Sequence, residues 1–204
     1  MSPVADAVSA ETILDTAAGM IERDGVATFT MRGLAEQLGV AVTSIYWHVG
    51  GRDKLFDKLV DRLLSEMANL PVDGTTPVER IASLARSQRK ALIERQHLLA
   101  IAHERDRTPT LFLPIQQRLA RMLSELGVSG TDAALVLRAV QVQVISSAVM
   151  QFSAVRGAKH DEEDPSLWDD DWPDQALVQA LQSPTDYDAV FEYGLRALLA
   201  TLPR

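Results

Sequence analysis

A glycine between two short segments of helical apolar spacing constrains the fold of this chain more than any other sequence feature. Residues 31–38 place Leu34, Ala35 and Leu38 on one face of a helix, and Thr30 precedes them as an N-cap residue. Gly39 follows, and glycine adopts the left-handed conformation that ends a helix without the Cβ clash of other residues. The pattern predicts a helix over 31–38 that ends in a turn at Gly39.

A second short helix is predicted over residues 42–48. Val40 and Ile45 are expected to pack inward, and the small side chain of Ala35 leaves room for the two helices to approach closely. The outward side would then carry small, hydroxyl-bearing or amphipathic groups that suit base edges and phosphate oxygens. These groups are Val42, Thr43, Ser44, Tyr46 and His48. The layout is that of a helix-turn-helix DNA reader, with the second helix as its recognition helix.

Several of these side chains have a structural interpretation beside the functional one. Tyr46 could be a partly buried aromatic, but a Tyr, a Trp and a His in succession are hard to bury together on a short helix, which favours DNA contact. His48 could be a surface histidine without a role, but its place at the end of the recognition helix favours a phosphate contact. Trp47 is balanced between packing and DNA contact, because large aromatic residues at helix junctions are often packing residues. The charge cluster around Arg52 is typical of a solvated face, but phosphate binds at helix N-termini, which favours a phosphate contact for Arg52.

Helical periodicity continues along the rest of the chain, with no convincing strand and no internal repeat. Further helices are predicted over residues 9–24, 52–70, 76–94, 108–126, 131–155, 173–181 and 185–201. The sequence therefore predicts an all-α fold. We expect a three-helix DNA-binding domain over residues 1–55, joined by a long helix to a larger helical domain over residues 56–204.

Composition excludes several classes of protein. Of the 204 residues, 47% are hydrophobic, which suits a chain with a real core and not a disordered one. Cysteine is absent, which excludes disulfides and thiolate chemistry. We expect no stretch apolar enough to cross a bilayer and no signal peptide, and therefore a cytoplasmic protein.

The net charge of −8 argues at first against a nucleic-acid partner, since DNA binding draws on Lys and Arg. Residues 158–174, however, hold eight of the acidic side chains against Lys159 alone, and without them twenty acids face nineteen bases. The spacing of these acids fits no EF-hand, so we interpret the segment as a solvated, mobile connection and not as a cation site. Residues 28–60 carry four bases and three acids, which predicts a DNA face that is only slightly positive.

Motifs of catalysis are missing from the sequence. Four histidines and many carboxylates are present, but there is no GxSxG, no HExxH, no phosphate loop and no cysteine nucleophile. We therefore expect no enzyme, and we expect neither a metal site nor a cofactor.

The sequence TSIYWHVGGRDKLFDKLVD, at residues 43–61, resembles the DNA-binding domain of the TetR family of bacterial transcriptional repressors. The resemblance covers residues 9–60 well, and FEYGLRALLATL near the end is similar to the last helix of the tetracycline repressor of that family. It implies base contacts by Arg32, Thr43 and Ser44 and phosphate contacts by Thr30, Tyr46, His48 and Arg52, with Val42 and Trp47 completing the predicted DNA face. Ala41 and Val42 stand where the tetracycline repressor has polar residues, and Thr43 stands where it has proline. These departures imply a different operator.

The resemblance also implies a small apolar or amphipathic effector, bound in the larger domain, that favours a dimer with wrongly spaced readers and so releases the DNA. His103 lies near the place of a metal-binding histidine of the tetracycline repressor, but Gln151 stands where the metal-chelating glutamate is expected. A tetracycline–magnesium site is therefore not expected, and His103 is then more typical of a hydrogen bond between helices. Candidate pocket residues are His103, Phe112, Met150, Gln151 and Phe152, with Trp168 or Trp172 as additions, although aromatics at helical spacing are usually core.

The expected helix over 131–155 is apolar nearly all round and should be buried on more than one side. The last helix, over 185–201, has a broad apolar band in which Gly194 and Ala197 allow close approach. The resemblance implies that these two helices pair with those of a second copy as a four-helix bundle; a purely intramolecular core is the alternative. The predicted dimer contacts are Leu137, Val140, Val144, Phe191, Leu195 and Leu198. A two-fold dimer would place two recognition helices about one DNA turn, roughly 34 Å, apart on a palindromic operator.

Together these features predict a ligand-responsive transcriptional repressor that binds a palindromic operator as a homodimer. Repression itself is inferred from the family by analogy. The alternative is a helical interaction module without sequence-specific DNA binding, which would keep the turn at Gly39 but would not need exposed Thr43, Tyr46 and Arg52. The presence of those three side chains favours the DNA reader.

Overall fold

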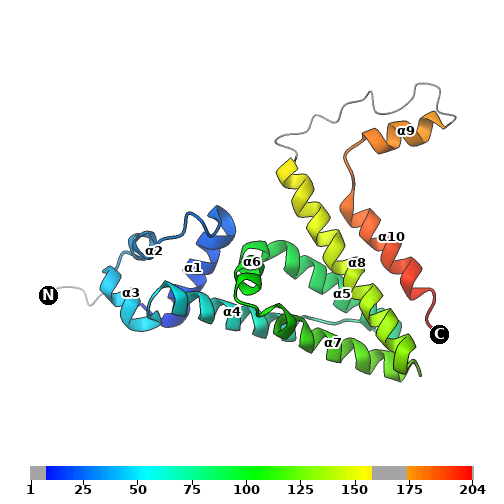
Figure 1. Ribbon diagram of the computed structural model, residues 1–204, viewed down its shortest axis with the longest axis horizontal. Helices are drawn as coiled ribbons and strands as arrows, with labels where there is room; N and C mark the ends of the chain where they lie inside the picture. Colours follow the sequence, from blue (N-terminus) through cyan, green and yellow to red (C-terminus); the bar gives the residue numbers. More distant parts are fainter. Residues whose placement is uncertain (1–7, 158–173, 204) are drawn as a thin grey trace. The chain divides into compact units, whose positions relative to one another are not determined.

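The structure, a computed structural model, describes residues 8–157 and 174–203, and every regular element within these ranges is a helix. In chain order the helices are α1 (Ala10–Asp24), α2 (Met31–Leu38), α3 (Val42–Val49), α4 (Arg52–Ala68), α5 (Pro77–Glu94), α6 (Gln96–Glu104), α7 (Thr108–Glu125), α8 (Gly130–Gly157), α9 (Gln175–Gln182) and α10 (Tyr187–Leu199) (Figure 1). The all-α prediction is confirmed.

Helix boundaries follow local signals in the sequence. The Ser9 hydroxyl accepts a hydrogen bond from the Thr12 amide at the start of α1, and the Asp174 carboxylate caps the Leu177 amide of α9 in the same way. The predicted helices agree with the observed ones to within two residues at each end. The predicted start of the helix over 173–181, and the acidic connection over 158–173, lie outside the described residues.

α6 departs from the sequence analysis, which placed no helix between residues 94 and 108. Arg95 separates it from α5 with φ −118° and ψ 29°, and no glycine or proline marks that break in the sequence. Leu98, Ile101 and Ala102 of α6 are buried. Because tertiary contacts and not a breaker residue set this boundary, the periodicity alone could not locate it.

The chain divides into two compact units, residues 1–72 with 90–119 and residues 73–89 with 120–204. The core of the first unit is built from one apolar face of each of its first four helices. Its fully buried large side chains include Ile13, Ile21, Leu34, Ile45, Leu55, Leu59, Leu63 and Met67. The buried side chains of α4 follow one apolar stripe, as do those of α1, where Leu14 is half-buried.

A carboxylate of α1 holds the start of α6 within the first unit. Glu22 accepts hydrogen bonds from the backbone amides of His97 (3.2 Å) and Leu98 (3.1 Å), in the first turn of α6, where helix N–H groups have no partner inside the helix. Burial raises the pKa of Glu22, and the two hydrogen bonds oppose that rise. α1 is thereby tied to the helix that ends at the turn over 105–107.

In the second unit α8 lies along α10 (Figure 1). Val140 and Val144 of α8 and Phe191 and Leu195 of α10 are almost fully buried. Gly194 allows the close approach that the sequence suggested, because a Cβ at this position would collide with the side chain of Gln143.

The burial of these side chains corrects the predicted dimer contacts. Val140, Val144, Phe191 and Leu195 are at most 2% exposed within a single chain, so they have no surface left for a second copy. For these four residues the intramolecular alternative applies, while Leu137 and Leu198 are half-buried. The exposed apolar side chains of the same helices are instead Leu135, Val142, Val149, Met150, Val190 and Tyr193.

Helix α8 also corrects the expectation about membrane spans. By length and composition alone, Gly130–Ala154 is apolar enough to cross a bilayer, and it is the one such helix in the part of the chain that the structure describes. The same helix buries the polar side chains of Gln141 and Ser147 and packs on α10. Helix pairing therefore accounts for its apolar composition.

α5 begins with a capping box. The Thr76 hydroxyl accepts a hydrogen bond from the Glu79 amide (3.2 Å), and the Glu79 carboxylate accepts from the amides of Thr76 (3.0 Å) and Thr75 (2.8 Å). These hydrogen bonds to the charged form lower the pKa of Glu79 from 4.5 to about 2.

We expect the Glu79→Gln variant to lose the part of the stability that depends on this carboxylate. The pKa of Glu79 is lower in the folded chain than in the unfolded one, so the carboxylate stabilises the fold above pH 4.5 and loses that contribution as the pH falls toward 2. Urea unfolding of both proteins from about pH 7 to about pH 3 measures the effect. The difference in unfolding free energy between them should shrink toward low pH; a constant difference would contradict the capping role.

Candidate DNA interface and effector site

The turn between α2 and α3 has the geometry that the sequence predicts. The Thr30 hydroxyl accepts a hydrogen bond from the Gly33 amide (3.0 Å) and caps α2. Gly39 adopts φ 67° and ψ 28°, the left-handed conformation, and the Val40 amide donates to the Ala35 carbonyl at 3.1 Å. The roles assigned to Thr30 as N-cap and to Gly39 as helix end are confirmed.

One face of α3 is buried and the other is open. Ile45 and Val49 are at most 1% exposed and belong to the same core as Leu34 and Ala35 of α2. Leu38 and Val40, expected in the core, are only half-buried at the edge of the turn. The open side carries Val42, Thr43, Tyr46 and Trp47, with Ser44 and His48 half-buried beside them. The structure thus brings the predicted recognition residues together on one exposed face.

Trp47 is the most exposed of the large apolar side chains on this face, at 83%. Its ring meets that of His48 edge to face, with the ring centroids 4.7 Å apart, and this is the one aromatic pair recorded for it in the described chain. The packing interpretation of Trp47 is therefore wrong. An indole this exposed on the outer face of α3 is available to a partner.

Basic side chains of α4 bond to the end of α3 and to the segment between α1 and α2. Lys58 donates to the carbonyl of His48 (3.2 Å), close to the C-terminus of α3 where carbonyls lack a helical partner. Arg52 opens α4, donates to the Val26 carbonyl (3.2 Å) and stacks on Phe56, with its guanidinium carbon 5.0 Å from the ring centroid. These contacts hold Arg52 at the exposed N-terminus of α4.

Arg32 lies on the outer face of α2, where it pairs with Glu36 (3.0 Å). Both side chains are largely exposed, at 87% and 66%, so the pair contributes little to stability and exchanges readily for another partner.

The predicted effector residues lie in separate parts of the chain. In the first unit His103 is exposed, with its ring Nδ1 3.4 Å from the Thr108 hydroxyl, and Phe112 is half-buried on α7. In the second unit Met150 is 59% exposed, while Gln151 and Phe152 are half-buried. Trp168 and Trp172 lie outside the described residues. Nowhere in the described ranges do three His, Asp or Glu side chains gather in a group able to hold a metal ion.

Two neighbouring polar residues of α5 are buried in the second unit, and sequence reasoning singled out neither. The guanidinium of Arg89 donates to Ser147 (2.9 Å), Asp188 (2.6 Å) and Gln151 (2.6 Å). The side chain of Gln88 is fully buried, and neither its amide nitrogen nor its amide oxygen has a hydrogen-bond partner in the described structure. Arg89 thus links α5 to α8 and α10, whereas Gln88 keeps an unused donor and acceptor.

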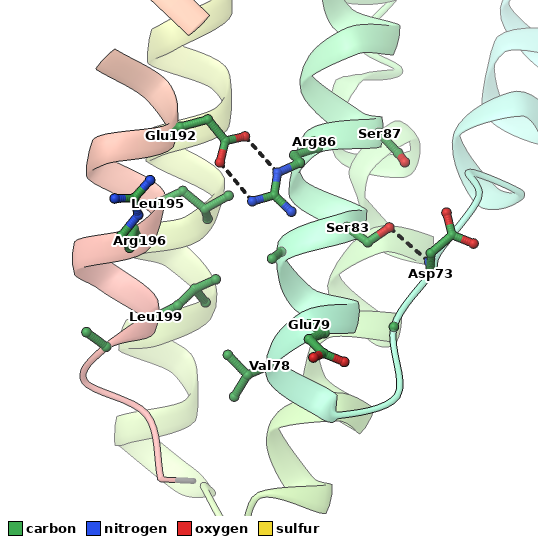
Figure 2. A pocket seen from close by; sticks show the side chains of 13 residues that line it. Asp73, Val78, Glu79, Ser83, Arg86, Ser87, Glu192, Leu195, Arg196 and Leu199 are labelled. Carbon is green, nitrogen blue, oxygen red and sulfur yellow. Dashed lines mark hydrogen bonds and ion pairs between the residues drawn. The ribbon is translucent and has the colours of Figure 1, made fainter. Parts of the chain in front are cut away.

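A groove of about 860 Å³ lies between α5 and α10 of the second unit (Figure 2). Arg86 reaches across it to Glu192 through two hydrogen bonds of 2.7 and 2.8 Å, which lower the pKa of the Glu192 carboxyl. Val78, Leu195 and Leu199 supply apolar surface. None of the five predicted effector residues lines the groove. Its two walls are more than a hundred residues apart in the chain, so no local sequence pattern indicates it.

Two family models match most of the chain. The model described as bacterial regulatory proteins, tetR family, matches residues 13–59, which include the α2–turn–α3 element. The model described as tetracyclin repressor-like, C-terminal domain, matches residues 70–203, more than half of the chain. The chain belongs to the TetR family of transcriptional regulators. This family is not enzymatic, so the expectation of no enzyme is confirmed.

Known proteins similar to this TetR-family regulator include the class D tetracycline repressor from Escherichia coli, 28% identical over 193 residues that cover 93% of this chain and 86% of the repressor. An HTH-type transcriptional regulator from Saccharopolyspora erythraea is 29% identical over 138 residues, 67% of this chain. The match spans only 58% of that relative's length. Among solved structures, Streptomyces coelicolor ActR in complex with (S)-DNPA is 26% identical with a TM-score of 0.63, over 98% of this chain and 97% of ActR.

We expect Gln88→Leu to raise the free energy of unfolding of this TetR-family regulator by about 1 kcal/mol, because an apolar side chain of similar size replaces an unpaired buried amide. The neighbouring variant Arg89→Met is the contrast, since it removes a paired guanidinium, and it should lower the free energy of unfolding by about 2 kcal/mol. Urea unfolding without added ligand measures both. A loss of stability in Gln88→Leu would show that the amide is paired, for example by buried water.

Proposed function

We propose that this TetR-family regulator represses transcription by binding a palindromic operator as a homodimer and that a small-molecule effector releases it. The observation that carries the proposal is the exposed outer face of α3, with Thr43, Tyr46 and Trp47 standing above buried Ile45 and Val49. A short helix held by its inner face after a tight turn is the arrangement with which a helix-turn-helix protein enters the major groove. We place the protein in the cytoplasm, where its DNA would be.

In this proposal residues 1–55 form the DNA-binding domain and residues 56–204 the ligand-binding and dimerisation domain. Arg32, Thr43 and Ser44 read base edges, and Val42 and Trp47 add apolar contact in the groove. Thr30, Tyr46, His48 and Arg52 hold phosphates and so set the position of the reader on the duplex. Arg52 suits this role because it sits at a helix N-terminus, where backbone amides also attract an anion.

The dimer is proposed to form through the exposed sides of α8 and α10. Leu135, Val142 and Val149 recur at seven-residue spacing on α8 and are 50% exposed or more, which makes one apolar stripe. Val190 and Tyr193 are exposed on the adjoining α10. Apolar side chains gathered along two packed helices favour burial against an identical surface of a second copy.

The proposed effector is a small apolar or amphipathic molecule bound by the larger domain. ActR, with which this chain shares its fold, has been solved in complex with (S)-DNPA and with actinorhodin, which supports a small organic ligand here. His103 and Phe112 in the first unit, and Met150, Gln151 and Phe152 in the second, remain separate candidate contacts. Buried Gln88 supports a ligand that carries a polar group, because such a group would supply the missing hydrogen bonds. If the effector binds more tightly to the dimer state with low affinity for the operator, effector binding would release the DNA.

The competing function is a helical interaction module without sequence-specific DNA binding. The exposure of Thr43, Tyr46 and Arg52 favours the DNA reader, because their hydroxyl and guanidinium groups suit base edges and phosphates. The two functions predict opposite results when the protein is offered random DNA.

Binding-site selection from a random duplex library tests the proposal. The wild-type protein should enrich a palindrome and bind it in a salt-dependent manner. Tyr46→Ala should weaken binding about tenfold by removing a phosphate contact, and Tyr46→Phe, which keeps the ring, should show whether the hydroxyl makes that contact. The Ile45 core is untouched in both variants. If the wild-type protein enriches no sequence, the result would favour the interaction module instead.

Sedimentation equilibrium tests the dimer surface. Val142→Asp puts a charge in the exposed stripe of α8 and should raise the dimer dissociation constant at least about tenfold, since the carboxylate would be buried without a partner. Leu113→Asp on α7 is the matched control, because Leu113 is an exposed apolar side chain too, at 49%, but lies outside α8 and α10. Equal dissociation constants for the two variants would place the dimer surface elsewhere.

A further inference from the structure

We infer that Arg105, at the end of α6, is a positioning residue for DNA binding that pairs with two carboxylates beside Arg52 on α4 and offsets one of their two charges. The inference rests on the proposed function. Arg105 lies in the first unit with α4, about fifty residues beyond it in the chain. Arg105 lies outside the helix-turn-helix pattern, and only its contacts in the structure indicate its role.

A single guanidinium bridges two acids of α4. Arg105 donates through Nη1 to Asp57 at 2.5 Å and through Nη2 to Asp53 at 3.2 Å. These acids are four residues apart, so they lie on one face of α4, one turn after the other. The Arg105 side chain is 25% exposed, whereas that of Asp53 is 94% exposed. The guanidinium is therefore held against α4 while the first of its partners faces solvent next to Arg52.

Phe56 connects Arg105 to Arg52 through its ring. The guanidinium carbon of Arg52 lies 5.0 Å from the ring centroid, and that of Arg105 lies 5.7 Å from it. Phe29 packs against the same ring, with the centroids 5.6 Å apart, and fixes its position. Two like charges share one aromatic ring, an arrangement that the acids paired with Arg105 make favourable.

The backbone after α6 directs this contact. Asp106 adopts φ 55°, and it is the one residue other than glycine with positive φ in the described chain. The Arg107 amide then donates to the Ala102 carbonyl at 2.9 Å and closes the turn. Arg107 donates to Asp61 at 2.8 Å, one turn further along α4 than the pair made by Arg105. Both arginines of this turn therefore face α4.

Charge explains why the contact matters for DNA. Residues 28–60 carry only one more basic than acidic side chain, so the net positive charge of the proposed DNA-binding region is small. Unpaired carboxylates of Asp53 and Asp57 would repel the phosphate proposed to bind at Arg52. Arg105 offsets one of these two charges and holds both carboxylates in ion pairs. Arg105, a residue of the proposed larger domain, thus reduces the negative charge near the phosphate contact proposed for Arg52.

Fluorescence anisotropy with the duplex enriched by the wild-type protein tests this inference. Arg105→Gln should weaken binding about tenfold at low salt and less at high salt, because screening reduces the repulsion. Arg107→Gln is the matched control: it removes the same charge from the same turn but unpairs Asp61, which lies further from Arg52, and binding should change less than about twofold. Adding Asp53→Asn and Asp57→Asn to Arg105→Gln should restore the affinity.

The variants separate an electrostatic role of Arg105 in DNA binding from a purely structural one. Arg105→Gln binding as tightly as wild type, or a triple variant as weak as Arg105→Gln, would overturn the inference. Should Arg105→Gln fail to fold by urea unfolding, the Asp53→Asn/Asp57→Asn double variant with Arg105 intact replaces it, and it should bind more tightly than wild type. Failure of the wild-type protein on every duplex would instead refute the proposed function, so the two failures are distinguishable.

Discussion

The turn at Gly39 is the constraint on which the reader depends. A left-handed residue ends α2 there, and only after that reversal can Ile45 and Val49 of α3 reach the core that Leu34 begins. The inner face of α3 is then fixed, and its outer face is open as a consequence. DNA contact in a helix-turn-helix protein needs this division, because side chains read base edges only when the helix that carries them cannot roll.

Ion pairs between α4 and the α6–α7 turn offset acidic charge beside the proposed DNA-facing surface. The acids of α4 are not left to oppose phosphate: Asp53 and Asp57 pair with Arg105, and Asp61 pairs with Arg107. Lys58 is used in a different way, on the carbonyl of His48 at the end of α3. Surface pairs of this kind add little stability. Their effect is to set local charge and position, and they connect the proposed reader to helices beyond it.

In the second unit one helix has two different apolar sides. α8 buries Val140 and Val144 against α10 and leaves Leu135, Val142 and Val149 exposed, so only one of its apolar sides is covered within the described chain. Polar side chains are buried beside this contact. Arg89 is fully occupied by partners on α8 and α10, while Gln88 next to it has none in the described structure. Arg89 therefore holds the helices together, whereas the Gln88 amide has an unused hydrogen-bond donor and acceptor within the described residues.

The sequence by itself determined the features whose causes are local: the cap at Thr30, the left-handed Gly39, the all-α fold and the outward face of α3. It could not determine which side of an apolar helix meets which neighbour, because that depends on elements far away in the chain. Hence Val140 and Phe191 were misassigned to a dimer contact, α6 was missed at a break without glycine or proline, and Trp47 was left undecided. Only the tertiary structure brought Arg105 to Asp53 and Asp57, since side chains some fifty residues apart have no common pattern to read.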